Sequence, residues 1–553
     1  MNIAFIPIDN RPVCYTLPEQ ICAIDSSINL FIPERKYLGS LTKYADVDKI
    51  FEWLENIPQV DAIVMCLDTV AYGGLISSRR CPDTFDEIKN RVENLKSILE
   101  KKNAKIYAFS SIMRISNNNV NEEEKEYWDK WGKKIFDYSY QTHKLGTESC
   151  ISNIIPSEIL DDYLATRKRN FEINKLYLEY QKQGLFDTLV FSKDDCAEYG
   201  FNVQEAQMLE KFGGFVKTGA DEIPLTLLAR AVVKFFDAKM QRCRDAKSFT
   251  DTVAQSRHCE CERSNPVNPK TVGRDYYPDN ITSLKISPIF LAPEYKDLIS
   301  NYEDVSIEKS VKGQLELAGC EVCEPDEADI LLYVNNFEDH QGEIVMKVPT
   351  KPFSKKWQRP EKPYMIADVR YANGADNEFV KQLFEVGLGD NFYGYSAWNT
   401  SANSLGSLIC GAVVKFFDAK SFTEPVAQSR HCECERSNPV KLNTVITRSD
   451  ERRSNPIQFE NDENARNGNP KTVGWDYYPD NKNENFLKLQ TVRFLDDWAY
   501  QANVRQELKS PDEKLVKEKM KPYEKMVFEL LGVDYNISYK FTWNRLFEVE
   551  VCI

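Results

Sequence analysis

Carboxylates, amides and arginines follow short apolar runs in the first half of this sequence, and these side chains could do acid–base chemistry. The runs include residues 3–8 (IAFIPI), 61–67 (DAIVMCL) and 105–112 (KIYAFSSI), whose length and composition are typical of buried strands. The polar residues that follow such runs are Asp9, Asn10, Arg11, Asp68, Tyr72, Arg114, Asp194, Asp195, Asp221 and Glu222. Because the carboxyl ends of parallel strands meet at one edge of a sheet, we predict that these residues line one polar site.

The same pattern returns in the second half, after the strand-like runs 286–291, 329–336 and 365–369. The polar and aromatic residues predicted to bind substrate there are Asp368, Asn373, Asp376, Trp398, Asn399, Asn403, Asp496 and Asp497. An Asp or Asn after a strand is also the ordinary N-cap of the next helix, so capping is the alternative for each of them. The Asp496–Asp497 pair has a further alternative, a solvated helix face.

The adjacent Asp194 and Asp195 are the predicted catalytic pair. Mutual repulsion and burial push the pKa values of neighbouring carboxyl groups apart, so one stays protonated as a general acid while the other stabilises charge. Glycoside hydrolysis runs on carboxylates alone, and Asn, Arg, Tyr and Trp side chains hydrogen-bond to sugars and stack on them. We therefore expect a carbohydrate-directed hydrolase that needs no cofactor.

Two other functions fit the same residues. Asp9, Asp68, Asp194 and Asp221 could bind Mg²⁺ or Mn²⁺ in a metal-dependent hydrolase, because hard cations prefer carboxylate oxygens. A non-catalytic protein could instead clamp a polar small molecule between two lobes.

A repeat interrupts the chain twice. Residues 246–267 return almost unchanged at 419–440, AVVKFFDAK occurs at 231–239 and at 412–420, and NPKTVGRDYYPDN at 268–280 returns at 469–481 with one change. The core of the repeat, SRHCECERSNP, has no helical or strand period and resembles the translated product of a dispersed bacterial repeat element. A metal site made of His258, Cys259, Cys261, His431, Cys432 and Cys434 is the alternative to inserted sequence without selected chemistry.

Strand-like runs alternate with helical segments in the rest of the chain, which indicates a largely parallel α/β protein. We expect two α/β lobes; a β/α barrel with a smaller α/β domain is the alternative. The predicted parts are an N-terminal lobe at 1–230, a disordered repeat insertion at 231–280, a second lobe at 281–412, a second disordered insertion at 413–481, and a helical segment completing the second lobe at 482–553.

Composition narrows the partners and the compartment. The 553 residues carry a net charge of about −14 and show no basic stripe with interleaved aromatics, so nucleic acid is not an expected partner. No stretch reads as a signal peptide or a membrane span, and the fifteen cysteines have no framework spacing. We therefore expect a cytoplasmic protein with reduced thiols that binds a polar small molecule or sugar.

The chain resembles the bacterial domain of unknown function family numbered 4127. The matching stretches, in order, are PIDNRP, LDTVAYGGLISSR, FSKDDCAEYG, TGADE, IADVRYANGAD, AWNTSANSLG, RFLDDWAYQ and WNRLFEV. They span nearly the whole chain outside the repeats. The resemblance implies a family but no activity.

Overall fold

The computed structural model describes residues 1–194, 196–257, 284–421 and 483–553. Its first half holds a six-stranded sheet in which all neighbouring strands run parallel. Across the sheet the strands are β2 (Asn29–Phe31), β1 (Asn2–Ile6), β3 (Ala62–Cys66), β4 (Lys105–Ile112), β5 (Thr188–Lys193) and β6 (Phe215–Thr218). The central strands are almost wholly buried, as parallel strands covered on both faces must be.

A five-stranded parallel sheet forms in the second half. Its strands are, in order, β13 (Phe392–Ser396), β11 (Tyr364–Asp368), β9 (Ile330–Asn335), β7 (Lys285–Phe290) and β8 (Glu321–Val322). In both sheets the second strand lies outside the first and the third lies on the first strand's other side, which is a doubly wound order. The predicted α/β class with two largely parallel sheets is confirmed, and neither sheet closes into a barrel within the described residues.

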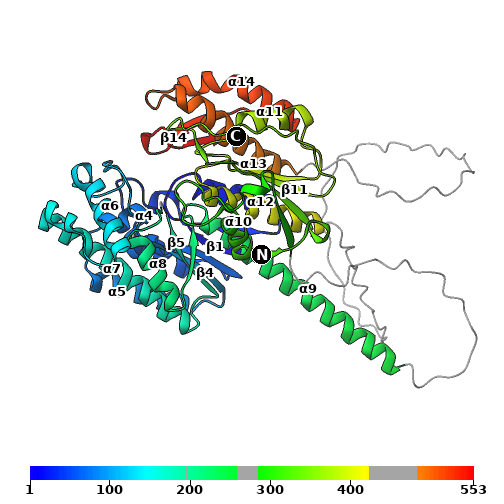
Figure 1. The fold of residues 1–553 in the computed structure, drawn as a ribbon. Helices are drawn as coiled ribbons and strands as arrows, with labels where there is room; N and C mark the ends of the chain where they lie inside the picture. The colour runs from blue at the N-terminus through cyan, green and yellow to red at the C-terminus, as the bar shows by residue number, and fades with distance from the viewer. Residues whose placement is uncertain (195, 258–283, 422–482) are drawn as a thin grey trace, which may run out of the picture. The chain divides into compact units, whose positions relative to one another are not determined.

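Helices cover the first sheet (Figure 1). The capping box formed by Thr84 and Glu87 shows why one of them, α5, begins where it does. The helices are α1 (Thr16–Cys22), α2 (Val47–Asn56), α3 (Leu67–Tyr72), α4 (Leu75–Arg80), α5 (Phe85–Leu99), α6 (Trp128–Leu145), α7 (Ser157–Lys182), α8 (Phe201–Lys211) and α9 (Ile223–Arg257).

The elements that accompany the second sheet end in an antiparallel hairpin. They are α10 (Ile307–Leu317), the short pair β10 (Gly342–Glu343) and β12 (Tyr371–Ala372), α11 (Asn377–Val386), α12 (Ser401–Ser421), α13 (Glu484–Arg493), the π-helical segment η5 (Phe494–Asn503), α14 (Glu513–Leu531), β14 (Ser538–Phe541) and β15 (Val549–Cys552). In Figure 1 the red α14 and β14 lie next to each other, and α14 also contacts α13. No helix in the described parts of the chain is both long and apolar enough to span a bilayer.

The two copies of AVVKFFDAK pack against each other as parts of α9 and α12. Phe236 and Phe417 occupy the same position in the two copies, and their rings stack with centroids 4.5 Å apart and planes 6° apart. Residues 231–233 and 412–414 are buried. The disordered insertions predicted to begin at 231 and 413 therefore begin as buried helix, because these apolar residues form part of the core; residues 258–280 and 422–481 lie outside the described residues.

Candidate functional site

The loop after β1 carries the first polar group of the site. The Asp9 Oδ1 accepts the backbone N–H of Arg11 at 3.0 Å, an Asx-type turn that bends the chain and aims the arginine back over the strand end. The Arg11 Nε lies 3.0 and 2.9 Å from the two Asp9 carboxylate oxygens, and its Nη2 donates to Asp221 Oδ1 at 2.5 Å. Burial raises the pKa of Asp9, and the Asp221 charge adds to that rise against the opposing effect of Arg11.

The Arg11–Asp221 pair joins loops from distant strands. Asp221 follows β6, which lies four strand positions from β1, a separation of roughly 19 Å at the usual spacing between strands. A direct ion pair therefore requires the loops to fold inward over the carboxyl edge of the sheet. This arrangement brings Asp9, Arg11 and Asp221 together, as the sequence pattern predicted.

The segment between β14 and β15 covers this cluster. The Trp543 indole N–H donates to Asn10 Oδ1 at 2.7 Å, and the guanidinium groups of Arg11 and Arg545 lie 5.3 and 4.7 Å from the centroid of the Trp543 ring. Trp543 and Asn544 both have φ of 54°, the left-handed region that costs an L-residue about 1–2 kcal/mol. Strain of this kind concentrates at functional sites.

Three arginines from separate parts of the chain surround Glu123. Its carboxylate accepts from Arg114 Nη2 and Arg545 Nη1, each at 2.8 Å, and lies 3.7 Å from Arg79 Nη2. We call Arg79, Arg114 and Arg545 the arginine cage. Burial alone would raise the pKa of Glu123, but the three guanidinium groups outweigh it and hold this pKa well below its usual range.

Predicted site residues reach the edge of the arginine cage. Asp194 Oδ2 lies 3.6 Å from Arg114 Nη1, so the predicted ligand Arg114 and the predicted catalytic Asp194 are neighbours. Glu124 Oε1 accepts from Arg79 Nη1 at 3.0 Å and from Arg114 Nε at 3.3 Å. Asp195, the other half of the predicted catalytic pair, lies outside the described residues.

Asp68 and Tyr72 are buried residues of α3. Asp68 Oδ2 accepts the backbone N–H of Ser111 at 2.9 Å, so Asp68 ties β3 to β4 instead of capping its own helix. Burial raises the pKa of Asp68 to about 6. The Tyr72 ring is buried under the Arg169 guanidinium, 5.6 Å from its centroid, which makes Tyr72 part of the helix packing.

A small pocket opens where the loop after β1 meets the end of β13, and β15 closes it. Its volume is about 30 Å³, which is room for one or two water molecules. Residues from four elements line it: Pro12, Val13, Thr16, Leu17, Gln20, Trp398, Val492, Arg493, Asp496, Glu548, Val549, Glu550 and Val551. We call this the carboxyl pocket, because Asp496 and Glu548 both line it and the charge of Glu548 raises the pKa of Asp496.

Glu548 has one engaged oxygen and one without a partner. Its Oε1 accepts the Val13 backbone N–H at 3.3 Å, whereas Oε2 is buried and has no hydrogen-bond partner among the described residues. Burial raises the pKa of Glu548 to about 7 against the lowering effect of Arg11, and Asp9 adds to the rise. Burial and the neighbouring Asp497 raise the pKa of Asp496 well above its usual value.

The π-helical segment η5 sends Asp496 and Asp497 to different partners. Asp497 Oδ2 accepts from the Ala397 backbone N–H and from Arg493 Nη2, both at 2.7 Å, while Asp496 Oδ1 accepts from Gln501 Nε2 at 3.2 Å. Both carboxyl groups are buried, so the alternative of a solvated helix face does not hold. Such π-segments are rare and occur frequently at functional sites.

Asp368 and Asp376 form a buried network at the end of β11. Asp368 accepts from Asn335 Nδ2 and from the Asp376 backbone N–H, each at 2.8 Å, and from the Tyr395 hydroxyl at 3.1 Å. Burial and the Asp376 charge raise the pKa of Asp368 to about 7. Asp376 Oδ1 accepts the Glu378 backbone N–H at 3.0 Å, so Asp376 is the N-cap of α11, the alternative that the sequence had left open.

The remaining predicted residues join segments of the second lobe to the first. Asn403 Oδ1 accepts the Ala220 backbone N–H at 3.1 Å, and Glu222 Oε2 accepts the Ser407 backbone N–H at 2.7 Å, which fixes α12 to the loop after β6. Burial raises the pKa of Glu222 to about 8. Asn373 and Asn399 both have positive φ and share a backbone hydrogen bond of 2.8 Å next to Trp398.

Two of the four carboxylates predicted as possible metal ligands, Asp9 and Asp221, pair with an arginine. Asp9 and Asp221 share the Arg11 guanidinium, the charge that a metal ion would otherwise bring. In the parts of the chain that the structure describes, no three His, Cys, Asp or Glu side chains are grouped so that they could hold a metal ion. The predicted ligands in the two HCEC repeats, His258, Cys259, Cys261, His431, Cys432 and Cys434, lie outside those parts.

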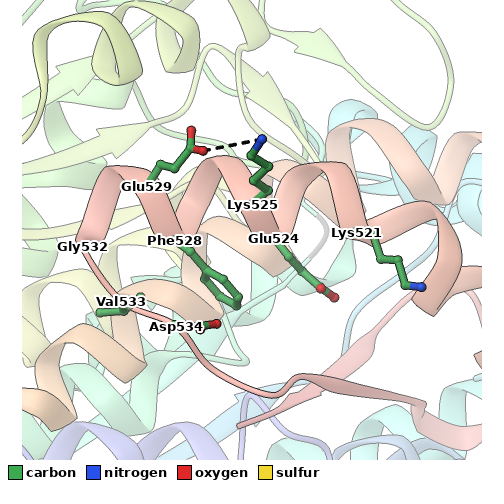
Figure 2. Close-up of a pocket in the computed structure, with 8 residues that line it drawn as sticks. All are labelled: Lys521, Glu524, Lys525, Phe528, Glu529, Gly532, Val533 and Asp534. Atoms are coloured by element: carbon green, nitrogen blue, oxygen red, sulfur yellow. Dashed lines mark ion pairs between the residues drawn. The ribbon is translucent and has the colours of Figure 1, made fainter.

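A wider hollow of about 760 Å³ lies elsewhere, along the C-terminal turns of α14 (Figure 2). Phe528, Lys525 and Glu529 are among the residues that line it, and Figure 2 shows Lys525 and Glu529, which pair at 3.9 Å, on the opposite side of the helix from Phe528. None of the predicted site residues lines this hollow. The carboxyl groups with raised pKa values favour the carboxyl pocket instead.

The strand-end pattern did not identify four residues of the candidate site: Glu548, Trp543, Arg545 and Glu123. The first three lie in a segment that carries no strand-end signal, although WNRLFEV was one of the stretches that carried the family resemblance. Glu123 lies in an acidic run between β4 and α6, which reads as ordinary solvated loop.

Two doubly wound, parallel sheets with helices, and a C-terminal hairpin that contacts the loop after β1, define this protein as an α/β protein. The family model described as "Protein of unknown function (DUF4127)" matches residues 3–552, and the chain belongs to that family. No curated protein and no solved structure matched the chain.

Proposed function

We propose that this protein is a carbohydrate-directed hydrolase in which Asp496 is the general acid and Glu548 the general base. The observation that carries the proposal is the free, buried Oε2 of Glu548 in a water-sized pocket that Asp496 shares. Burial raises the pKa of both carboxyl groups, and the charge of Glu548 adds to the rise for Asp496, so we assign the shared proton to Asp496 and the ionised form to Glu548. One proton on a pair of interacting carboxyl groups supplies both an acid and a base.

The chemistry follows from these protonation states. A water molecule in the carboxyl pocket would donate to Glu548 Oε2, which removes its proton as the water attacks the anomeric carbon. Asp496 gives its proton to the departing glycosidic oxygen, so the bond breaks without forming an alkoxide. Arg11 and Arg493 remain charged beside the pair and favour its ionised member.

A carbohydrate fits the remaining surface better than an apolar substrate. Trp398, Thr16 and Gln20 line the pocket, and Trp543 contacts both Asn10 and Arg11 in the nearby Arg11 cluster, which lowers the pKa of the pocket residue Glu548. Aromatic faces next to hydroxyl and amide groups suit the stacked, hydrogen-bonded recognition of sugars. The predicted Asp194–Asp195 pair remains a separate prediction, because Asp194 is directed to Arg114 and Asp195 is outside the described residues.

The test is hydrolysis of a panel of 4-nitrophenyl glycosides by the purified chain and by Asp496→Asn and Glu548→Gln. Each variant should lose at least about 100-fold in kcat, the usual contribution of a positioned acid or base. Glu529→Gln, which changes an exposed carboxylate on α14, is the matched control and should keep full activity. Cleavage that survives both pocket substitutions would rule out these roles; tight sugar binding without any turnover would favour a binding protein.

A further inference from the structure

We propose that the arginine cage is a binding site for a ligand carboxylate, which makes the expected substrate an acidic sugar. Arg79, Arg114 and Arg545 come from α4, the end of β4 and the C-terminal hairpin, and all three contact the carboxylate of Glu123. Arg79 and Arg114 also bind Glu124, Arg114 lies 3.6 Å from Asp194, and Arg545 lies 3.5 Å from Glu122. The identity of the substrate rests on the proposed hydrolase function, whereas anion binding at the cage does not.

The cage has hydrogen-bond donors to spare. Arg545 uses Nη1 for Glu123, but its Nε and Nη2 are buried and have no hydrogen-bond partner among the described residues, and the same is true of Arg79 Nε. Nε and Nη2 form the edge of a guanidinium that binds a carboxylate through two parallel hydrogen bonds. Buried donors without partners are costly, so an oxygen-rich ligand at this edge would stabilise the site.

Glu123 shows that the arginine cage binds a carboxylate group. It lies on the segment between β4 and α6 that forms neither helix nor strand, and its side chain is 23% exposed at the rim of the cage. Neighbouring Val120 is 58% exposed, so this segment is held mainly by its polar contacts. Glu123 therefore occupies the place of a ligand carboxylate and competes with it.

The cage and the carboxyl pocket lie within reach of one ligand. Arg545 and Glu548 are three residues apart, a span of at most about 10 Å along an extended chain. The Arg545 guanidinium also stacks on the rings of Trp543 and Phe547, at 4.7 and 5.4 Å. A hexuronate unit could thus place its carboxylate at Arg545 and its ring beside these aromatics while its glycosidic bond reaches the pocket.

The test is isothermal titration calorimetry of the purified full chain with D-glucuronate and with D-glucose, the neutral sugar of the same shape. Glucuronate should bind at least about tenfold more tightly than glucose, and both Arg545→Gln and Arg545→Lys should lose that preference, because Lys keeps the charge but not the fork. Glu123→Gln should bind glucuronate about fivefold more tightly than the wild type, since the competing carboxylate is gone.

The gain expected from Glu123→Gln protects the test against misfolding, because a damaged protein cannot bind more tightly. Lys525→Gln, which changes an exposed side chain of α14, is the control and should bind like the wild type. Equal affinity for the two sugars, or no binding to either the wild type or Glu123→Gln, would overturn the proposal, and so would displacement of glucuronate by sulfate or phosphate at lower concentration than by acetate. Glucuronate binding without cleavage of any glycoside would support the anion-binding role of the cage and rule out the proposed hydrolase function.

Discussion

Trp543 donates its indole N–H to Asn10 at 2.7 Å, although the two residues are 533 positions apart. This hydrogen bond places the C-terminal hairpin over the loop that follows the first strand. It also holds the Trp543 ring in contact with both Arg11 and Arg545 and so links the Arg11 cluster to the arginine cage. The site is therefore assembled only when the two ends of the chain meet.

The first prediction concerns this bond. Trp543→Phe keeps the aromatic ring but leaves Asn10 Oδ1 without its donor, so it should lower the free energy of unfolding by about 1 kcal/mol. Trp543→Ala should cost more, because both cation–π contacts disappear, each worth about 0.5–1 kcal/mol. Urea unfolding measures both values. Trp53→Phe, in a half-buried tryptophan of α2, is the matched control, and an equal effect there would show that the bond to Asn10 adds no stability.

Backbone strain gives the second prediction. Asn544 is exposed and has φ of 54°, which a β-branched residue tolerates poorly. Asn544→Gly should change the free energy of unfolding by less than about 0.5 kcal/mol, whereas Asn544→Val should lower it by about 1–2 kcal/mol. Thermal and urea unfolding of the two variants measure the difference. If Val proves as stable as Gly, the hairpin turn is not held in this conformation.

The strands and much of the first lobe's site could be predicted from the sequence, because parallel strands are continuous apolar runs that stop at polar residues. The run at 105–112 is β4, and the convergence of Asp9, Arg11 and Asp221 follows from the rule that carboxyl ends share an edge. Glu548 could not be found this way. Its position depends on a hairpin near the C-terminus that packs against the loop after the first strand. The local sequence pattern does not predict a contact between residues so far apart in the chain.

Asp376 shows the second reason why prediction stopped short. An aspartate after a strand can line a site or cap a helix, and only three-dimensional contacts distinguish the two; here the Glu378 N–H at 3.0 Å makes it a cap. Asp496 and Asp497 show a third reason. A π-helical register aims adjacent carboxyl groups at different partners, and a period of 3.6 residues does not reveal that.

The third prediction is a dependence of stability on pH that comes from Glu222. Burial raises its pKa from 4.5 to about 8, so the folded protein holds this proton more tightly than the unfolded chain does. The stabilisation that protonation brings is complete below pH 4.5 and is lost as the pH rises to about 8, with a slope of ~1.4 kcal/mol per pH unit. Glu222→Gln keeps an acceptor for the Ser407 N–H and should remove this slope.

Urea unfolding of the wild type and of Glu222→Gln across pH 4.5 to 8.5 measures the effect as the difference between the two proteins, so that other titrating groups cancel. The variant should become the more stable protein by a few kcal/mol at the alkaline end. Glu529→Gln, exposed on α14, is the control and should follow the wild type. Parallel curves for the wild type and Glu222→Gln would show that Glu222 ionises without cost in the folded protein.

The fourth prediction is the dependence of kcat on pH that the proposed hydrolase mechanism requires. The rate should rise with pH through about 7, as Glu548 loses its proton and becomes able to accept one from water. It should fall again at higher pH as Asp496, whose pKa burial and the Asp497 charge raise well above its usual value, loses the proton that the leaving oxygen needs. Measuring kcat against pH checks both limbs. Arg11→Lys should shift the rising limb upward, because a weaker, more mobile charge beside Glu548 favours its ionised form less; an unchanged limb in that variant would show that Glu548 is not the group that titrates.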